Sequence, residues 1–190
     1  EGFLDKLMGP EEAAAYREAM GEEGGSSTTD VSSAGLTPEQ SARLKVVQDR
    51  ERSRELVEQR KREYLAWAVE FNRGDDDPQA WIDGTFTFNP DGTVDTKGDL
   101  ILGSMGVKGL TRLPKGLNRV NGNFYFNHNK FTSLEGLPSE IQNDLNLQDS
   151  DGLGSLEGLL GTKIKGNLIL RGIPATTIPE GIDLGGKVVV

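Results

Sequence analysis

The feature that most constrains the fold is a repeat in the C-terminal half of the chain. Each unit opens with a turn pair and an apolar-x-apolar triplet, and the triplets start at Leu100, Phe124, Leu145, Leu168 and Val188, which are 24, 21, 23 and 20 residues apart. A second block of shared apolar residues follows each of the first four triplets. Such units stack into a solenoid, because one unit cannot bury its apolar face alone.

The alternation within each triplet predicts which side chains form the core. The outer residues of a triplet point to one face and the middle residue points to the other. If the triplets stack as parallel strands, their outer residues point inward and form the core. These residues are Leu100, Leu102, Phe124, Phe126, Leu145, Leu147, Leu168 and Leu170.

The second block predicts a returning apolar layer. Its members are Leu113, Leu117, Leu134, Leu137, Leu156, Leu159, Ile178 and Ile182. Pro114, Pro138 and Pro179 favour an extended return over a helix. Glycines at one equivalent position are expected to form tight turns, namely Gly116, Gly136, Gly158 and Gly181.

The second unit carries a family resemblance. Its segment Phe124-Tyr125-Phe126-Asn127-His128-Asn129-Lys130-Phe131 fits the pattern L-x-L-x-x-N-x-L, with Asn129 at the asparagine position. The repeat resembles the leucine-rich repeats, and its second block is similar to that of short bacterial repeats, including those of secreted effectors. The resemblance covers residues 98–190 and implies an α/β solenoid, a short right-handed array of about four to five units. The asparagine position holds Met105, Ser150 and Ile173 in the other units.

Composition divides the chain before the repeats. Leu, Ile, Val and Phe make up 13 of the first 73 residues but 35 of the other 117, so only the second part can bury a sizeable core. Residues 1–37 are interpreted as an acidic arm with short helices and a flexible linker. This arm is either disordered or a helical element that docks through Phe3, Leu4, Leu7 and Tyr16.

Residues 38–73 are predicted to form one long charged helix. Thr37, Pro38 and Gln40 form a capping box with proline at the first helical position. Near the other end, an apolar stripe is expected to cover the open end of the solenoid together with Trp81; it comprises Tyr64, Leu65, Trp67, Ala68 and Phe71. The charged middle is either a solvated helix held by opposite-charge pairs or a self-association helix.

Residues 74–97 are predicted to form an N-terminal cap that contains a β-hairpin. The strand Gly84–Phe88 alternates apolar and polar residues, Asn89-Pro90-Asp91-Gly92 is a turn, and Thr93–Asp95 is the return strand. We expect Asp75-Asp76-Asp77 to be an exposed acidic turn rather than a metal site.

Composition also argues against several function classes. The chain has no Cys and one His, which removes thiolate chemistry and most His-based sites, so we expect no enzyme activity, no metal and no cofactor. His128 is expected to be an exposed turn residue. A net charge of −9 without a basic cluster argues against nucleic acid as a partner. No apolar run is long enough for a membrane span.

The positive functional prediction is a protein or peptide-binding surface on the concave face of the solenoid. The residues expected to line it are Asp99, Ile101, Asn123, Tyr125, Asn127, Asp144, Asn146, Gln148, Asn167, Ile169 and Arg171. Two alternatives stay open: the recognition or regulatory segment of a larger bacterial effector or enzyme, for example of ubiquitin-ligase type, and a purely structural repeat.

The remaining expectations concern the state of the chain. We expect a monomer, with association through the charged helix as the alternative. The compartment stays open between cytoplasm and exterior. Because the chain begins at Glu1 without Met and ends on the strand Lys187–Val190, we expect a fragment of a longer protein.

Overall fold

The structure is a computed structural model, and it describes residues 36–71, 73, 76–103 and 109–190. The chain divides into two units between Arg54 and Glu55, inside helix α3. Residues 1–35, which make up most of the predicted acidic arm, and residues 104–108, which include Met105, lie outside the described residues.

Helix α3 spans Pro38–Glu70, and its start confirms the predicted capping box. The Thr37 N–H donates to Gln40 Oε1 at 2.9 Å, and the Gln40 N–H donates to Thr37 Oγ1 at 3.2 Å. The helix ends three residues before the predicted boundary at residue 73. Ion pairs join neighbouring turns, such as Arg60 with Glu63 at 2.7 Å, which fits the solvated-helix interpretation of the charged middle.

Aromatic side chains from the last turns of α3 pack on the segment that precedes the repeats. The Trp67 ring stacks on Trp81 with centroids 6.2 Å apart, and Tyr64 meets the edge of Phe86 at 5.0 Å. Trp67 also donates its Nε1–H to the Arg112 carbonyl at 3.1 Å. The predicted stripe is therefore buried at this end of the second unit, except for Leu65, which is half-buried.

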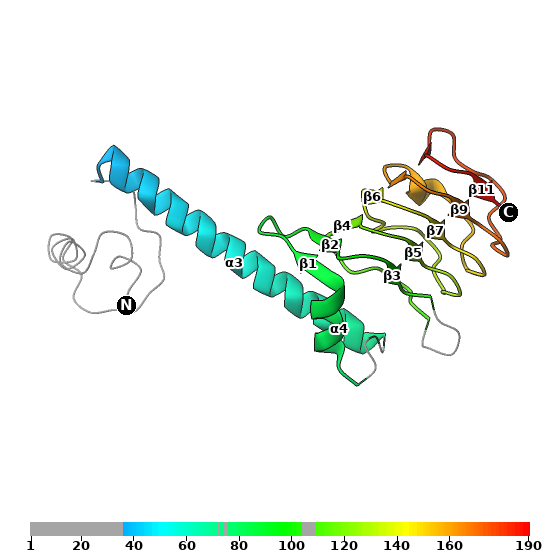
Figure 1. Cartoon of the computed structure of the whole chain (residues 1–190), viewed down its shortest axis with the longest axis horizontal. Coiled ribbons are helices and arrows are strands. Elements are labelled where there is room, and N and C mark those ends of the chain that lie inside the picture. The colour runs from blue at the N-terminus through cyan, green and yellow to red at the C-terminus, as the bar shows by residue number, and fades with distance from the viewer. Residues whose placement is uncertain (1–35, 72, 74–75, 104–108) are drawn as a thin grey trace. The chain divides into compact units, whose positions relative to one another are not determined.

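Trp81 lies on helix α4 (Pro78–Thr85), which the sequence analysis does not predict. Asp77 caps this helix, because its Oδ1 accepts the Ala80 N–H at 2.9 Å. Strands β1 (Phe86–Phe88) and β2 (Val94–Thr96) follow and pair antiparallel, which confirms the predicted hairpin. Figure 1 shows α4 leading directly into this hairpin.

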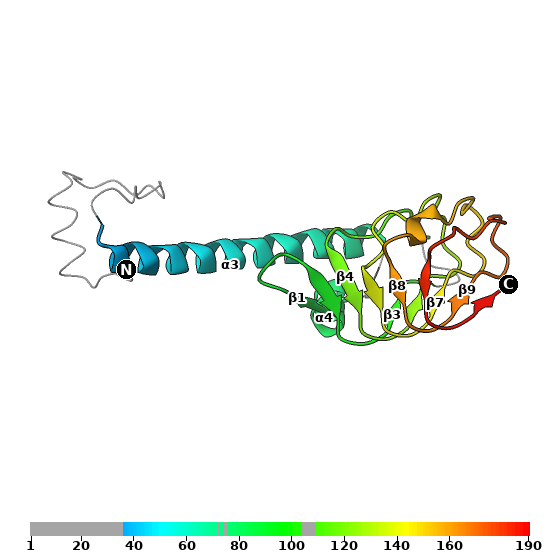
Figure 2. The ribbon, with the colours of Figure 1, turned by 90° about the horizontal axis from the view of Figure 1, so that it is seen from above.

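The repeats wind through two sheets, and each coil gives one strand to each sheet (Figures 1 and 2). Sheet A has the order β1-β2-β4-β6-β8-β10, with β4 at Leu117–Val120, β6 at Glu140–Ile141, β8 at Lys163–Ile164 and β10 at Asp183–Leu184. Sheet B has the order β11-β9-β7-β5-β3, with β3 at Leu100–Ile101, β5 at Phe124–Tyr125, β7 at Leu145–Asn146, β9 at Leu168–Ile169 and β11 at Val188–Val189. Every pair except β1 with β2 is parallel, so the repeats form a β-solenoid.

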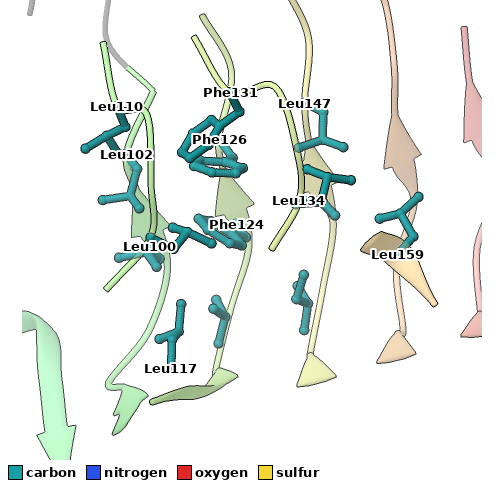
Figure 3. Packing of buried hydrophobic residues seen from close by; sticks show 14 of the residues in the cluster. Leu100, Leu102, Leu110, Leu117, Phe124, Phe126, Phe131, Leu134, Leu147 and Leu159 are labelled. Carbon is teal, nitrogen blue, oxygen red and sulfur yellow. The ribbon is translucent and has the colours of Figure 1, made fainter. Parts of the chain in front are cut away.

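The core lies between the two sheets and the returning segments (Figure 3). All eight predicted inward side chains of the triplets are buried, which confirms the alternation. Leu110, Phe131 and Leu153 from the returning segments are buried with them. The rings of Phe126 and Phe131 lie 4.0 Å apart between their centroids, so a single coil closes on itself through aromatic packing.

Sheet A itself is a finding that the sequence analysis misses. Val120, Ile141 and Ile164 are buried at equivalent positions of its parallel strands β4, β6 and β8. They recur 21 and 23 residues apart, in phase with the triplets, and this spacing is the signal that could have revealed the second sheet. Strands β6 and β8 each contain one apolar residue, Ile141 and Ile164, instead of the apolar-x-apolar triplet that marks the strands of sheet B, so local alternation does not indicate them.

One side chain of the predicted returning layer is exposed, and one of its glycine turns differs in type from the other three. Ile178 is 39% exposed, because among the described residues no further coil packs on that side of the last return. Gly158 does not form a positive-φ turn, since it lies in the 3-10 helix η1 (Glu157–Leu159). In that coil Gly161 takes the left-handed conformation with φ +94°, while Gly116, Gly136 and Gly181 do so as predicted.

Candidate binding face on sheet B

The central feature of the site is a row of outward side chains along sheet B. Strand pairing places them in register from one coil to the next. The row, called here the outer row of sheet B, consists of Ile101, Tyr125, Asn146, Ile169 and Val189. Ile101 is 60% exposed, and the other four are half-buried. The structure therefore brings the predicted middle residues together on one surface.

A ladder of polar side chains runs along one edge of this row, at the corner before each strand of sheet B. Asp99 Oδ1 accepts the Asn123 N–H at 2.7 Å, and Asn123 Oδ1 accepts the Asp144 N–H at 3.2 Å. Asp144 Oδ1 accepts the Asn167 N–H at 2.6 Å, and Asn167 Oδ1 accepts the Lys187 N–H at 3.0 Å. Four predicted binding residues thus satisfy the backbone donors of the following coil.

The polar ladder, called here the corner ladder, carries different charges at its two ends. Asp99 and Asp144 are acidic and belong to the earlier coils, whereas Lys187 occupies the last position of the ladder. Lysine has no acceptor atom, so its side chain cannot extend the chain of hydrogen bonds. The first and last rungs of sheet B therefore carry opposite charges at this edge.

The other edge of the outer row contains Gly103, Asn127, Gln148 and Arg171. A Cβ on Gly103 would lie 2.3 Å from Asn127 Oδ1, so only glycine permits this approach between coils. Asn127 and Gln148 are half-buried, and Arg171 is exposed. Together with the ladder, these residues give the outer row a polar rim on both sides, which is the usual anatomy of an interface.

Left-handed residues follow this second edge. His128, Asp149 and Gly172 take φ values of 54°, 53° and 68° at equivalent positions of successive coils. His128 is half-buried rather than exposed as predicted, and its Nδ1 lies 3.7 Å from Asp149 Oδ2. Stacking against the next coil explains the burial, because each bend packs on the equivalent bend.

Asn129 has a structural role at the position that carries the family resemblance. Its side chain is 3% exposed, its Oδ1 accepts the Leu110 N–H at 3.0 Å, and its Nδ2 donates to the Asn127 carbonyl at 3.2 Å. Ser150, one coil later, is also buried and donates its hydroxyl to the Phe126 carbonyl at 3.4 Å. This position therefore satisfies backbone groups in the interior.

The outer face of sheet A has the opposite character. Its outward side chains alternate in charge from one strand to the next; they are Asp95, Arg119, Glu140, Lys163 and Asp183. Arg119 pairs with Glu140 at 2.9 Å, and Lys165 pairs with the same carboxylate at 2.7 Å. The hydrogen bond from Lys165 lowers the pKa of Glu140 below its ordinary value. Two of these five charges, Arg119 and Glu140, thus form an ion pair across neighbouring strands, and Lys165 beside β8 adds a second contact to the same carboxylate.

Two searches of the described residues bear on other kinds of site. Among the residues that the structure describes, no three His, Asp or Glu side chains gather in a way that could hold a metal ion. No helix in the same part of the chain combines the length and the apolar character needed to cross a bilayer.

The fold and the two unlike faces define a β-solenoid repeat protein whose first coils are covered by a helix, a short helix and a hairpin. Comparison of the chain with protein families, with curated proteins and with solved structures found no match.

Proposed function

We propose that this chain is a non-catalytic interaction module that binds a protein or a peptide through the outer row of sheet B and its polar rim. The observation that carries the proposal is the contrast between the two sheets. Sheet A presents a charged residue on each of its five strands from β2 to β10, and Arg119 and Glu140 among them form an ion pair, whereas four of the five outward residues of sheet B are aliphatic or aromatic and Ile101 is exposed. Apolar anchors inside a polar rim are typical of binding surfaces.

The proposal includes the family of the repeats, namely the leucine-rich repeats. The L-x-L-x-x-N spacing around Asn129 favours a right-handed leucine-rich array, in which sheet B would carry the binding face. The buried Asn129 supports this assignment, because its amide satisfies backbone groups of its own and the preceding coil. The short second strand of each coil is an addition to the single strand that the sequence pattern alone predicts.

The test is affinity capture with quantitative mass spectrometry, using the intact chain as bait. The variant Tyr125→Ala with Ile169→Asp removes two anchors from the outer row, and Lys163→Ala on sheet A is the matched control. Both changes replace outward side chains, so circular dichroism and melting should be unchanged. We expect a partner that is retained by the wild type and by Lys163→Ala but lost from the double variant.

Either of two results would contradict the proposal. A partner captured equally by all three proteins would place binding on another surface. The absence of any specific partner from each host tested would favour the structural interpretation of the repeats.

A further inference from the structure

We propose that the partner of the outer row of sheet B is a second copy of this chain, packed face to face about a two-fold axis that runs parallel to β7. This inference rests on the proposed function, because it needs the outer row to be a contact surface. The argument comes from the order of side chains and charges along the row.

The outer row of sheet B is complementary to a second copy of itself that runs in the opposite order. A two-fold axis along the strand direction through the middle rung reverses the order of the rungs and keeps the direction of each strand. Ile101 then faces Val189 of the second copy, and Tyr125 faces Ile169 of the second copy. Each aliphatic or aromatic anchor thus meets another apolar side chain, as an isologous interface requires.

The residue on the axis is suited to this position. Asn146 Oδ1 accepts the Gln148 N–H at 2.9 Å, and a carbonyl oxygen keeps a second lone pair. Its Nδ2 makes no hydrogen bond with the described residues. Two copies of Asn146 that meet on the axis can therefore exchange reciprocal amide hydrogen bonds, and a single polar residue in an apolar row fixes the register of the pairing.

The charges at the corner ladder favour the same arrangement. The axis keeps both ladders on one side of the interface, so Asp99 at the first rung faces Lys187 of the second copy at the last rung. This gives two opposite-charge contacts in each dimer. The cost is at the axis, where Asp144 meets its own equivalent. Salt screens this contact and the two opposite-charge contacts alike, so one repulsive contact stands against two attractive ones.

The size of the surface sets the strength of the association. Five rungs span about 19 Å along the solenoid, and the row with its two edges, which are four residues apart in sequence, spans about 13 Å along the strands. This footprint is smaller than the roughly 800 Å² per partner of stable complexes, so we expect a weak and reversible dimer that forms only at high protein concentration.

The experiment is a charge exchange measured by sedimentation equilibrium on the intact chain at concentrations up to about 1 mM. The variants are Ile169→Asp and Tyr125→Lys, which face each other across the proposed axis. Each variant alone would bury unpaired charge of one sign, whereas an equimolar mixture would pair one Asp with one Lys. Lys163→Ala is the control on the opposite sheet.

For the wild type and Lys163→Ala we expect an average mass that rises from 20.6 kDa toward twice that value with concentration. Each charged variant should weaken association at least about tenfold, and the mixture should recover to within about threefold of the wild type. A wild type that stays monomeric overturns the proposal. Dimers that persist in both variants place association elsewhere, for example on the charged helix, and likewise overturn it, as does a mixture that fails to recover.

These results separate the two proposals. A monomeric wild type whose capture of another protein still depends on Tyr125 and Ile169 would remove the second copy as partner and leave the proposed function intact. If neither dimerisation nor the capture of another protein depends on Tyr125 and Ile169, both the proposed function and the proposed dimer are wrong.

Discussion

Replacing Asn129 with alanine should destabilise the solenoid more than any other single removal of a buried polar side chain in the repeats. The substitution deletes the acceptor of the Leu110 N–H, which is held at 3.0 Å, and the donor to the Asn127 carbonyl, which is held at 3.2 Å. Leu110 is completely buried, so no water replaces the lost acceptor.

The magnitude follows from the orphaned donor. A buried N–H without a partner costs about 1–3 kcal/mol, and the side-chain volume that alanine leaves empty adds to it, so we expect a loss of about 2–4 kcal/mol. For a folded unit of about this size, 1 kcal/mol corresponds to roughly 3–4 °C, which gives a fall in Tm of roughly 6–16 °C.

The measurement is urea unfolding followed by circular dichroism, with calorimetry for Tm. Ser150→Ala is the matched control, because Ser150 occupies the same position one coil later and makes one long bond of 3.4 Å. We expect it to cost less than about 1 kcal/mol. If Asn129→Ala costs no more than Ser150→Ala, the backbone role assigned to Asn129 is refuted.

Two further predictions concern close packing and pH. Gly158→Ala should lower the free energy of unfolding in urea by about 1–3 kcal/mol, because the new Cβ would lie 2.6 Å from Leu134 Cβ. Gly154→Ala is the control and should be neutral, because open space surrounds Gly154. Equal effects of the two substitutions would contradict this packing argument. The hydrogen bond from Lys165 is the main cause of the lowered pKa of Glu140. The ionised carboxylate therefore stabilises the fold above the unfolded-state pKa, and this stabilisation is lost as pH falls through the folded-state pKa. Glu140→Gln should weaken the dependence of the urea midpoint on pH between about 6 and 3, and an unchanged dependence would contradict a stabilising role of the Glu140 carboxylate.

The sequence was sufficient to predict the features of the fold that are strongly periodic. The inward residues of the triplets are all buried as predicted, because alternation determines the face on which a side chain lies. The capping box at Thr37 was predictable since its hydrogen bonds are local. Helix α4 carries a comparable signal in Asp77 followed by Pro78, which the acidic-turn interpretation obscured.

The second sheet could not be read from local patterns in the same way. Strand β8 (Lys163–Ile164) has one apolar residue where each strand of sheet B lies in an apolar-x-apolar triplet, so it shows no alternation of its own. Its stability comes from pairing with Glu140–Ile141 in the preceding coil and Asp183–Leu184 in the following coil. Only comparison between repeats reveals such a strand, because hydrogen bonds between coils rather than propensity create it.

The candidate site was predicted in position, but the role of part of its rim was not. All eleven residues lie on or beside sheet B, yet Asp99, Asn123, Asp144 and Asn167 direct side-chain oxygens along the solenoid axis to the next coil. Sequence alone could not show this, since a polar residue before a strand is equally compatible with solvent, a ligand or a neighbouring backbone. The binding role of all eleven stays a prediction.

Strand propensity is the simplest alternative explanation of the outer row of sheet B, because Ile, Tyr and Val favour strands in any context. Sheet A provides an internal comparison, since the same coils supply its outward residues in the same parallel geometry. If propensity alone selected outward side chains, both rows would be rich in β-branched and aromatic residues. Sheet A instead alternates acids and bases, so the same backbone accepts charged side chains without loss of pairing. Strand formation alone therefore does not explain the apolar character of sheet B, and this favours the proposed contact with a partner.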